Sequence, residues 1–152
     1  MQWCVKPFNQ LSTQELYAFL KLRIDVFVVE QTCYYPDLDN FDTHPDTLHI
    51  FAMEGDTCAA YLRILPPNTT YENMPSIGRV ATSADNRGSG LGYQLLALGV
   101  TTLEKTWPKH TCHISAQSHL QHFYEKYHFV RLGEEYLEDN IPHIGMERLP
   151  QG

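Results

Sequence analysis

The sequence predicts an α/β (α+β) fold, a single domain over residues 1–152 with a mixed sheet. Its 152 residues can bury a sizeable core, and no repeat, low-complexity stretch or linker divides them. Hydrophobic residues make up 43% and charged residues 19%, which is typical of a globular domain. Strand-like and helix-like patterns alternate along the chain in the order β-α-β-β-β-α-β-α-β-β.

The first half of the chain predicts a strand, a helix and three further strands. Alternating residues predict a strand at 2–8. Apolar residues at helical spacing predict one helix over 12–31, begun by a capping box at Ser12 and Glu15. The polar stretch 32–47 is expected to be a loop. Strands are then expected at 48–54, 58–65 and 76–82.

The second half predicts two helices and three strands. A helix is expected over 91–105, and Pro108 marks its end. Another is expected over 118–129, where Ser118 and Gln121 form a second capping box. The remaining strands are expected at 111–116, 130–137 and 143–149.

Charge and cysteine content restrict the partners and the compartment. A formal net charge of −7, with no run of lysine or arginine, argues against nucleic acid and suits a cationic amine better. The chain has neither an N-terminal signal sequence nor a run of 18 apolar residues, so we expect a cytoplasmic protein without membrane contact. Four cysteines without a CxxC pair are expected to stay reduced: Cys4, Cys33, Cys58 and Cys112.

A glycine-rich segment separates the strand at 76–82 from the helix at 91–105. Gly88, Gly90 and Gly92 fall within five residues, directly before the helix begins. A helix N-terminus presents free backbone N–H groups and a positive dipole end, and Arg87 adds a positive charge. This combination predicts a phosphate or pyrophosphate cradle.

Two common nucleotide loops do not fit this segment. A P-loop requires Gly-Lys-Ser/Thr, whereas Gly92 is followed by Tyr93. A dinucleotide fingerprint requires GxGxxG, whereas "GSGLGY" places the third glycine one position early. On spacing alone, a plain glycine-rich turn remains the alternative.

Three stretches resemble one known family. The run "RGSGLG" resembles the acetyl-CoA loop of the GNAT N-acetyltransferase superfamily, Gln/Arg-x-x-Gly-x-Gly/Ala. The later "HFYEKYHF" is similar to the family's Phe-Tyr-x-x-x-Gly-Phe, although His128 replaces the glycine, where a left-handed helix cap is expected. The stretch "LRIDVFVVEQTCYYPDLDNFD", with "HIF" and the ending "IPHIGM", resembles the ElaA-like branch over nearly the whole chain.

This resemblance implies a fold and an activity. The fold is that of the GNAT acyl-CoA N-acyltransferases, a mostly antiparallel sheet whose fourth and fifth strands splay, flanked by about four helices. The activity is transfer of an acetyl group from acetyl-CoA to a primary amine, by direct attack in a ternary complex and without a metal. The residues that the resemblance places on acetyl-CoA are Val80, Ala81, Thr82, Arg87, Gly88, Ser89, Gly90, Leu91, Gly92, Gln117 and Tyr124.

The family likeness also implies catalytic roles. The matching tyrosine, Tyr124, would protonate the leaving thiolate of coenzyme A. A core aromatic is the alternative, because Phe123 and Tyr127 beside it are expected to be in the core. Tyr124 itself falls at the border of the apolar helix face, from which a hydroxyl could reach a cleft. Glu30 and His49 are the candidates for the base that deprotonates the amine, although Glu30 could pair with Arg23 and His49 could be a hydrogen-bonded strand residue.

The acceptor is less defined. Arg79 could hold a substrate carboxylate or pair with an acid across the sheet. The acceptor is expected to be an amine on a small molecule or a peptide, and a homodimer is left open. The residues expected to contact it are Arg23, Phe27, Glu30 and Arg79.

Three alternative functions remain. One is a non-catalytic module that binds or senses acyl-CoA. The second is transfer of a longer acyl group, which the space near Phe27 and Val28 would decide. The third is an acyl-homoserine lactone synthase, which shares the pattern Arg23-x-x-Val26-Phe27. These synthases use an acyl carrier and S-adenosylmethionine, so the coenzyme A loop argues against them.

Two clusters are only superficially similar to metal sites. Asp37, Asp39 and Asp42 lack the glycine and glutamate that an EF-hand needs at its sixth and twelfth positions, so we expect a solvated or amine-facing acidic loop. His119 and His122 lie one helical turn apart without a third ligand, so we expect surface histidines and no metal.

Overall fold

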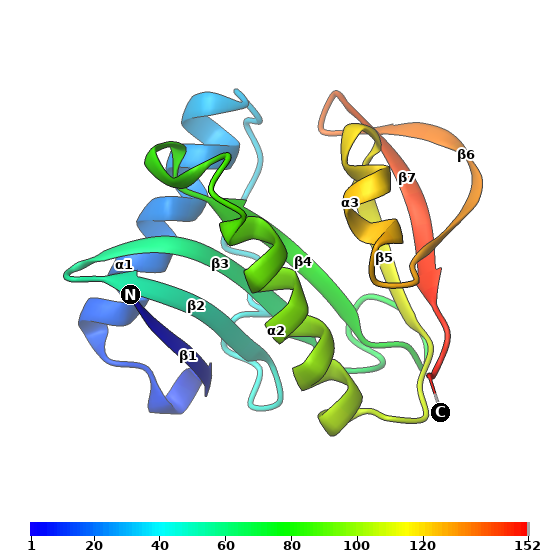
Figure 1. Ribbon diagram of the computed structural model, residues 1–152, viewed down its shortest axis with the longest axis horizontal. Helices are drawn as coiled ribbons and strands as arrows, with labels where there is room; N and C mark the ends of the chain where they lie inside the picture. The colour runs from blue at the N-terminus through cyan, green and yellow to red at the C-terminus, as the bar shows by residue number, and fades with distance from the viewer. Residues whose placement is uncertain (152) are drawn as a thin grey trace.

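Two antiparallel sheets lie side by side in the computed structural model, which describes residues 1–151 (Figure 1). The first has the strand order β1-β2-β3-β4 and the second the order β5-β7-β6. The first sheet consists of β1 (Gln2–Pro7), β2 (Leu48–Glu54), β3 (Thr57–Leu65) and β4 (Ser76–Thr82). The second consists of β5 (Cys112–Gln117), β6 (Val130–Glu138) and β7 (Ile141–Arg148). The predicted order of elements is confirmed.

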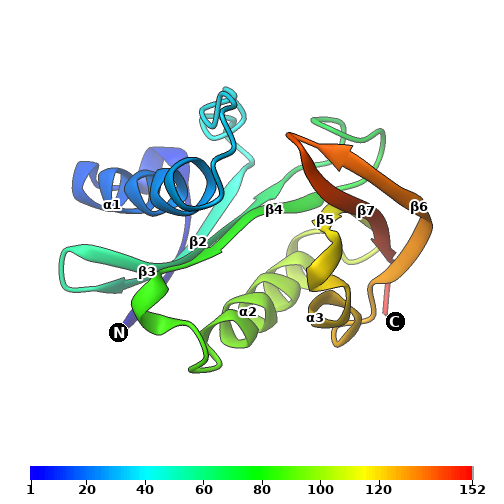
Figure 2. The same ribbon diagram turned by 90° about the horizontal axis from the view of Figure 1, so that it is seen from above.

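The two sheets meet where β4 and β5 begin and then separate (Figures 1 and 2). The backbone N–H of His113 donates to the carbonyl of Pro75 at 3.1 Å, but within residues 1–151 the two strands form no hydrogen-bonded ladder. The expected splay of the fourth and fifth strands is therefore present. It leaves β4 as an edge strand with backbone groups available on one side.

Helices cover both faces of the first sheet (Figure 2). Helix α1 (Thr13–Arg23) packs Phe19 against Phe51 of β2, and α2 (Leu91–Thr106) packs Leu95 into the core that contains Ile50 and Leu62. Because neighbouring strand residues point to opposite faces, Ile50 and Phe51 enter different cores. Short 3₁₀ turns lie at η1 (Phe8–Gln10), η3 (Ala84–Asn86) and η4 (Ser118–Leu120).

Two predicted helices differ from the structure. The capping box at Ser12 and Glu15 is confirmed, but α1 ends at Arg23 and continues as a π-helix, η2 (Ile24–Glu30). The N–H of Gln31 donates to the carbonyl five residues earlier, a bond that a 3.6-residue period does not predict. The later helix is shorter than expected: after η4 it forms only α3 (Gln121–Glu125). His128 has the expected left-handed conformation, with φ of 70°.

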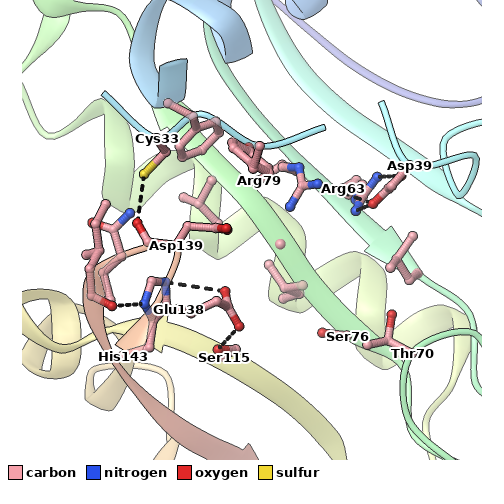
Figure 3. Close-up of a pocket in the computed structure, with 18 of the residues that line it drawn as sticks. Cys33, Asp39, Arg63, Thr70, Ser76, Arg79, Ser115, Glu138, Asp139 and His143 are labelled. Atoms are coloured by element: carbon pink, nitrogen blue, oxygen red, sulfur yellow. Dashed lines mark hydrogen bonds and ion pairs between the residues drawn. The ribbon is translucent and has the colours of Figure 1, made fainter. Parts of the chain in front are cut away.

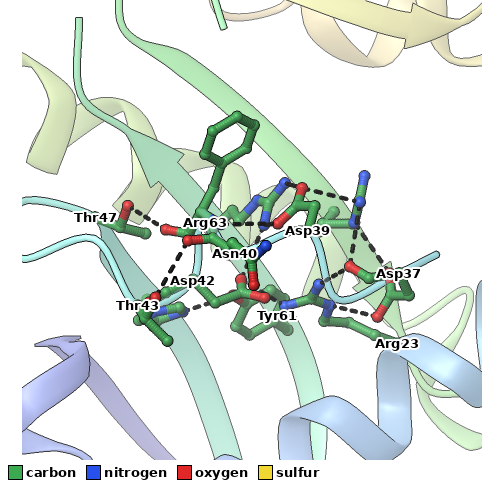
Figure 4. Close-up of polar contacts among 12 residues, drawn as sticks. Arg23, Asp37, Asp39, Asn40, Asp42, Thr43, Thr47, Tyr61 and Arg63 are labelled. Carbon is green, nitrogen blue, oxygen red and sulfur yellow. Dashed lines mark hydrogen bonds and ion pairs between the residues drawn. The ribbon is translucent and has the colours of Figure 1, made fainter. Parts of the chain in front are cut away.

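Asp37 and Asp42 of the loop between η2 and β2 are buried, so the expectation that this loop is solvated or faces an amine is wrong for these two residues. Figure 4 shows the polar contacts that they make. Arg23, which is 0% exposed, donates from Nε to Asp37 at 3.0 Å and from Nη1 to Asp42 at 2.8 Å. Arg63 of β3 binds Asp42 at 2.9 Å and Asp39 through both terminal nitrogens. Arg79 of β4 adds ion pairs with Asp37 and Asp39. The network thus contains three arginines and three aspartates, whose charges balance.

This network explains how a polar loop can enter the core. Buried charges are tolerated only when they are paired and hydrogen-bonded. Burial alone would raise the pKa of Asp42, but the guanidinium groups of Arg23 and Arg63 hold it below its ordinary value. The four cysteines are free, as expected, and all four are buried. Among residues 1–151, no helix is long and apolar enough to cross a membrane.

We expect Asp42→Asn to destabilise the protein by about 3 kcal/mol at neutral pH, because it leaves buried guanidinium charge without its partner. The folded-state pKa of Asp42 lies below its ordinary value of 3.8, so this stabilisation is present above about pH 4 and is lost as the pH falls through the folded-state value. The difference between variant and wild type should therefore shrink at acidic pH. Urea denaturation of the wild type and the variant, at neutral and at acidic pH, measures this difference in the free energy of unfolding.

Asp46→Asn is the matched control, because Asp46 lies exposed in the same loop. It should change the free energy of unfolding little. Equal effects of the two substitutions would contradict the assigned role of the buried network.

Candidate functional site

A cavity of about 280 Å³ occupies the space where the two sheets diverge (Figure 3). Side chains from distant parts of the chain line it: Phe27 from η2, Arg79 and Val80 from β4, Tyr124 from α3 and His143 from β7. The fold thus brings residues of both sheets and two helices to one place.

A β-bulge shapes the β4 side of the cavity. Gly78 pairs with Arg63 and Ala81 with Tyr61, so β4 has one more residue than β3 between these pairs. Arg79 lies in this bulge with φ of 54°, a left-handed conformation that a side chain rarely adopts. Such strain tends to occur at functional sites, and here it lies directly on the cavity wall.

The glycine-rich segment has the geometry of an anion cradle. Gly88 and Gly90 have φ of 82° and 85°, and an added Cβ would meet no atom within 4 Å, so the backbone conformation itself requires glycine. Gly90 caps α2 without a side-chain hydrogen bond, and the first helical bond runs from Gln94 to Gly90. The amides of the first turn of α2 therefore have no intrahelical acceptor.

Arg87 is held beside this cradle by two contacts. Its guanidinium pairs with the carboxylate of Glu30 at the end of η2 and donates to the carbonyl of Thr82 at 3.1 Å. Both charged side chains are exposed. Glu30 does not line the cavity, and its position fits an ion pair with Arg87 rather than the pairing with Arg23 considered above.

Tyr124 lines the cavity and is only 5% exposed. Its ring packs edge-on against Phe123 and Phe129. Burial raises the pKa of Tyr124 well above its ordinary value, so the phenol stays protonated near neutral pH. A protonated hydroxyl at a cavity wall can serve as a proton donor.

Two further residues that the sequence assigned to catalysis or acceptor binding, His49 and Arg23, also lie outside the cavity. His49 is fully buried, with Nδ1 2.7 Å from the hydroxyl of Tyr61 and Nε2 2.9 Å from the carbonyl of Asp42. Burial lowers its pKa, so the ring is neutral. Arg23 is buried in the ion-pair network. Both positions fit structural roles, the alternative already open for His49.

The remaining predicted residues divide between the cavity and the strands beside it. Gln117, at the end of β5, donates to the side chain of Gln31, the residue after η2, at 3.0 Å. Ala81 is buried in the core beneath α1, whereas Thr82 approaches Gly92 on the opposite face. The cavity therefore contains Phe27, Arg79, Val80, Gln117 and Tyr124 from the sequence-based set.

The structure adds residues that no motif indicated. Ser115, Glu138 and His143 line the cavity on the side of the second sheet. The stretch "IPHIGM" contains His143, but nothing in its spacing identified a polar cluster. Among residues 1–151, no group of three or more His, Cys, Asp or Glu side chains could hold a metal ion.

Comparison with known proteins agrees with this geometry. Residues 13–150 match the acetyltransferase (GNAT) domain family. Protein ElaA of Escherichia coli is 42% identical over 97% of this chain and 96% of its own, and its crystal structure aligns with a TM-score of 0.90. The crystal structure of an acyl-CoA N-acyltransferase from Pseudomonas aeruginosa is 46% identical over 97% of this chain and 98% of its own, with a TM-score of 0.91.

A more distant structure bears on the lactone synthases. The CoA-dependent acyl-homoserine lactone synthase BjaI, solved with SAM and isopentyl-CoA, has a TM-score of 0.70 over 90% of this chain and 76% of its own. At 20% identity it shows a shared fold alone. Because BjaI is CoA-dependent, a coenzyme A loop does not by itself separate the two classes, contrary to the expectation from sequence. The family match and the high identity to ElaA over nearly the full length show that the chain belongs to the GNAT acyltransferase family, in its ElaA-like branch.

Proposed function

We propose that this protein transfers an acetyl group from acetyl-CoA to a primary amine, by direct attack within a ternary complex. Membership of the GNAT family supports acyl transfer. The observation that carries the proposal is Tyr124, a buried and protonated phenol on the wall of the cavity between β4 and β5. A module that only binds acyl-CoA would not need a proton donor there.

The donor would lie along β4 and the start of α2. The pyrophosphate would accept hydrogen bonds from the amides between Arg87 and Gly92, and the released Arg87 side chain would add its charge. The pantetheine arm would pair with backbone groups of the β4 edge between Val80 and Thr82, as an added strand does. This path leads from the glycine-rich segment to the cavity, where Val80 and Tyr124 both lie.

The cavity would hold the acceptor. Glu138 provides negative charge for an ammonium group, and Arg79 would exchange its contact with Asp39 for a substrate carboxylate. Phe27 lines the cavity and would limit the acyl chain, whereas Val28 does not reach it. The cytoplasmic location and the homodimer stay predictions.

Release of free thiol from acetyl-CoA tests the function. The acceptors would be glycine, L-lysine, spermidine and a short peptide with a free N-terminus, and the donors acetyl-CoA and hexanoyl-CoA. We expect amine-dependent thiol release that is faster with acetyl-CoA. Tight binding of acetyl-CoA without thiol release would favour the binding module, and faster reaction of hexanoyl-CoA would favour the longer acyl group.

We expect Tyr124→Phe to lower kcat by about 100-fold or more with little change in the Kd of acetyl-CoA, because the thiolate loses its proton donor while the ring still packs. Steady-state kinetics and calorimetric titration separate the two quantities. Tyr127→Phe is the matched control, because Tyr127 follows α3 but does not line the cavity. Unchanged kcat in Tyr124→Phe would contradict the assignment.

We expect Glu30→Gln to tighten acetyl-CoA binding by about twofold to fivefold, since an exposed ion pair contributes about 0.2–1 kcal/mol and would no longer compete for Arg87. Its kcat should stay near the wild-type value. Calorimetry measures the Kd of acetyl-CoA, and initial rates measure kcat. A large loss of kcat with unchanged affinity would instead support Glu30 as the base.

A further inference from the structure

A polar cluster with no assigned role lines the second-sheet side of the cavity (Figure 3). The hydroxyl of Ser115 donates to Oε1 of Glu138 at 3.1 Å and lies 2.5 Å from the hydroxyl of Tyr136. Oε2 of the same carboxylate lies 3.5 Å from Nε2 of His143. The side chain of His143 is 9% exposed, so it is largely shielded from solvent while it remains on the cavity wall.

The hydrogen bonds fix which nitrogen of His143 can accept a proton. Nδ1 lies 2.7 Å from the carbonyl of Ile141, and a carbonyl can only accept, so Nδ1 carries the hydrogen. The lone pair of the neutral ring is therefore on Nε2. In the described chain Nε2 makes no hydrogen bond, because 3.5 Å to Glu138 is too long for a good one. That distance still lets the carboxylate stabilise a positive ring.

We propose that Nε2 of His143, with Glu138 beside it, accepts the proton that the acceptor amine must lose before it attacks. This assignment rests on the proposed acyl transfer. His143 and Tyr124 both line the cavity. The same cavity therefore offers a base for the attacking amine and an acid for the leaving thiolate. Ser115 is a positioning residue, because it orients the carboxylate of Glu138 through its hydrogen bond.

The protons and electrons of this reaction balance. The ammonium gives one proton to His143, and the freed nitrogen lone pair forms the N–C bond to the acyl carbon. The C–S bond then breaks with its electron pair on sulfur, which takes the proton of Tyr124. The second N–H proton reaches the Tyr124 phenolate through solvent, and His143 releases its own proton to solvent. The products are the amide, the free thiol of coenzyme A and one proton.

Several other side chains near His143 on the second-sheet side of the cavity can gain or lose a proton. Burial, aided by Tyr136 and Glu138, raises the pKa of Tyr71 to about 12. Burial also raises the pKa of Cys33 and of Tyr124, so these groups are neutral near pH 7. The titratable groups that face His143 or share its side of the cavity are Cys33, Tyr71, Tyr124, Tyr136, Glu138 and Asp139.

A pH profile combined with NMR tests the assignment. In the wild type, kcat/KM for acetyl-CoA and the best amine of the panel should fall at acidic pH, because a protonated base cannot accept the proton of the amine. His143→Gln should lower kcat about 100-fold at pH 7 and less at pH 9.5, where more of the amine is already neutral. Glu138→Gln should move the acidic limb of the profile to lower pH. The Kd of acetyl-CoA should stay unchanged in both variants.

The imidazole ¹⁵N shifts of His143 in the free protein provide a readout that needs no acceptor. They should show hydrogen on Nδ1 at high pH and protonation of Nε2 at the pH of the acidic limb. His122→Gln and Glu135→Gln are the matched controls, because both side chains are exposed and neither lines the cavity. Hydrogen on Nε2 in the neutral ring, or a pH-independent loss in His143→Gln, would overturn the assignment. Absence of thiol release in the wild type with every amine would instead overturn the proposed function.

Discussion

The divergence of β4 from β5 is the constraint on which the site depends. The strands begin in contact, at the hydrogen bond between His113 and Pro75, and then separate. A continuous ladder would use the backbone groups of β4 and leave no cavity. Because the strands splay, β4 keeps a free edge, and side chains of the second sheet face those of the first across a space of about 280 Å³. One extended ligand could therefore run from this gap to the start of α2, where no side chain caps the first amides.

The buried ion-pair network determines one wall of that space. Asp37 and Asp42 fix the loop after η2 to Arg23, while Asp39 joins Arg63 and Arg79 at the cavity. The loop, the end of α1 and the strands β3 and β4 are therefore held by one set of charges. This arrangement explains why a polar segment without helix or strand can form part of a defined cavity.

Local patterns predicted the order of the elements and the glycine-rich segment, and the resemblance to the GNAT family predicted Tyr124. The order of the elements and the glycine-rich segment depend on neighbours in sequence: the capping box at Ser12, periodic apolar residues and closely spaced glycines before a helix. The second predicted capping box, at Ser118, is absent, because the Ser118 hydroxyl has no hydrogen-bond partner in the described chain. The π-helix was missed because its i+5 bond leaves no periodic signal. The burial of Asp37 and Asp42 depends on Arg23 at the end of α1 and on Arg63 of β3, and the cluster around His143 depends on Ser115 of β5. Spacing along the chain does not reveal such pairs, so only the fold brings them into view.

Calorimetric titration of the protein with acetyl-CoA tests the central claim most directly. If acetyl-CoA is held between the start of α2 and the edge of β4, each chain should bind one molecule of it. Gly90→Val should abolish that binding without unfolding the protein, because a β-branched residue resists the φ of 85° that lets the first amides of α2 face the ligand. Absence of binding heat in the wild type, together with an unchanged melting temperature, would contradict the account.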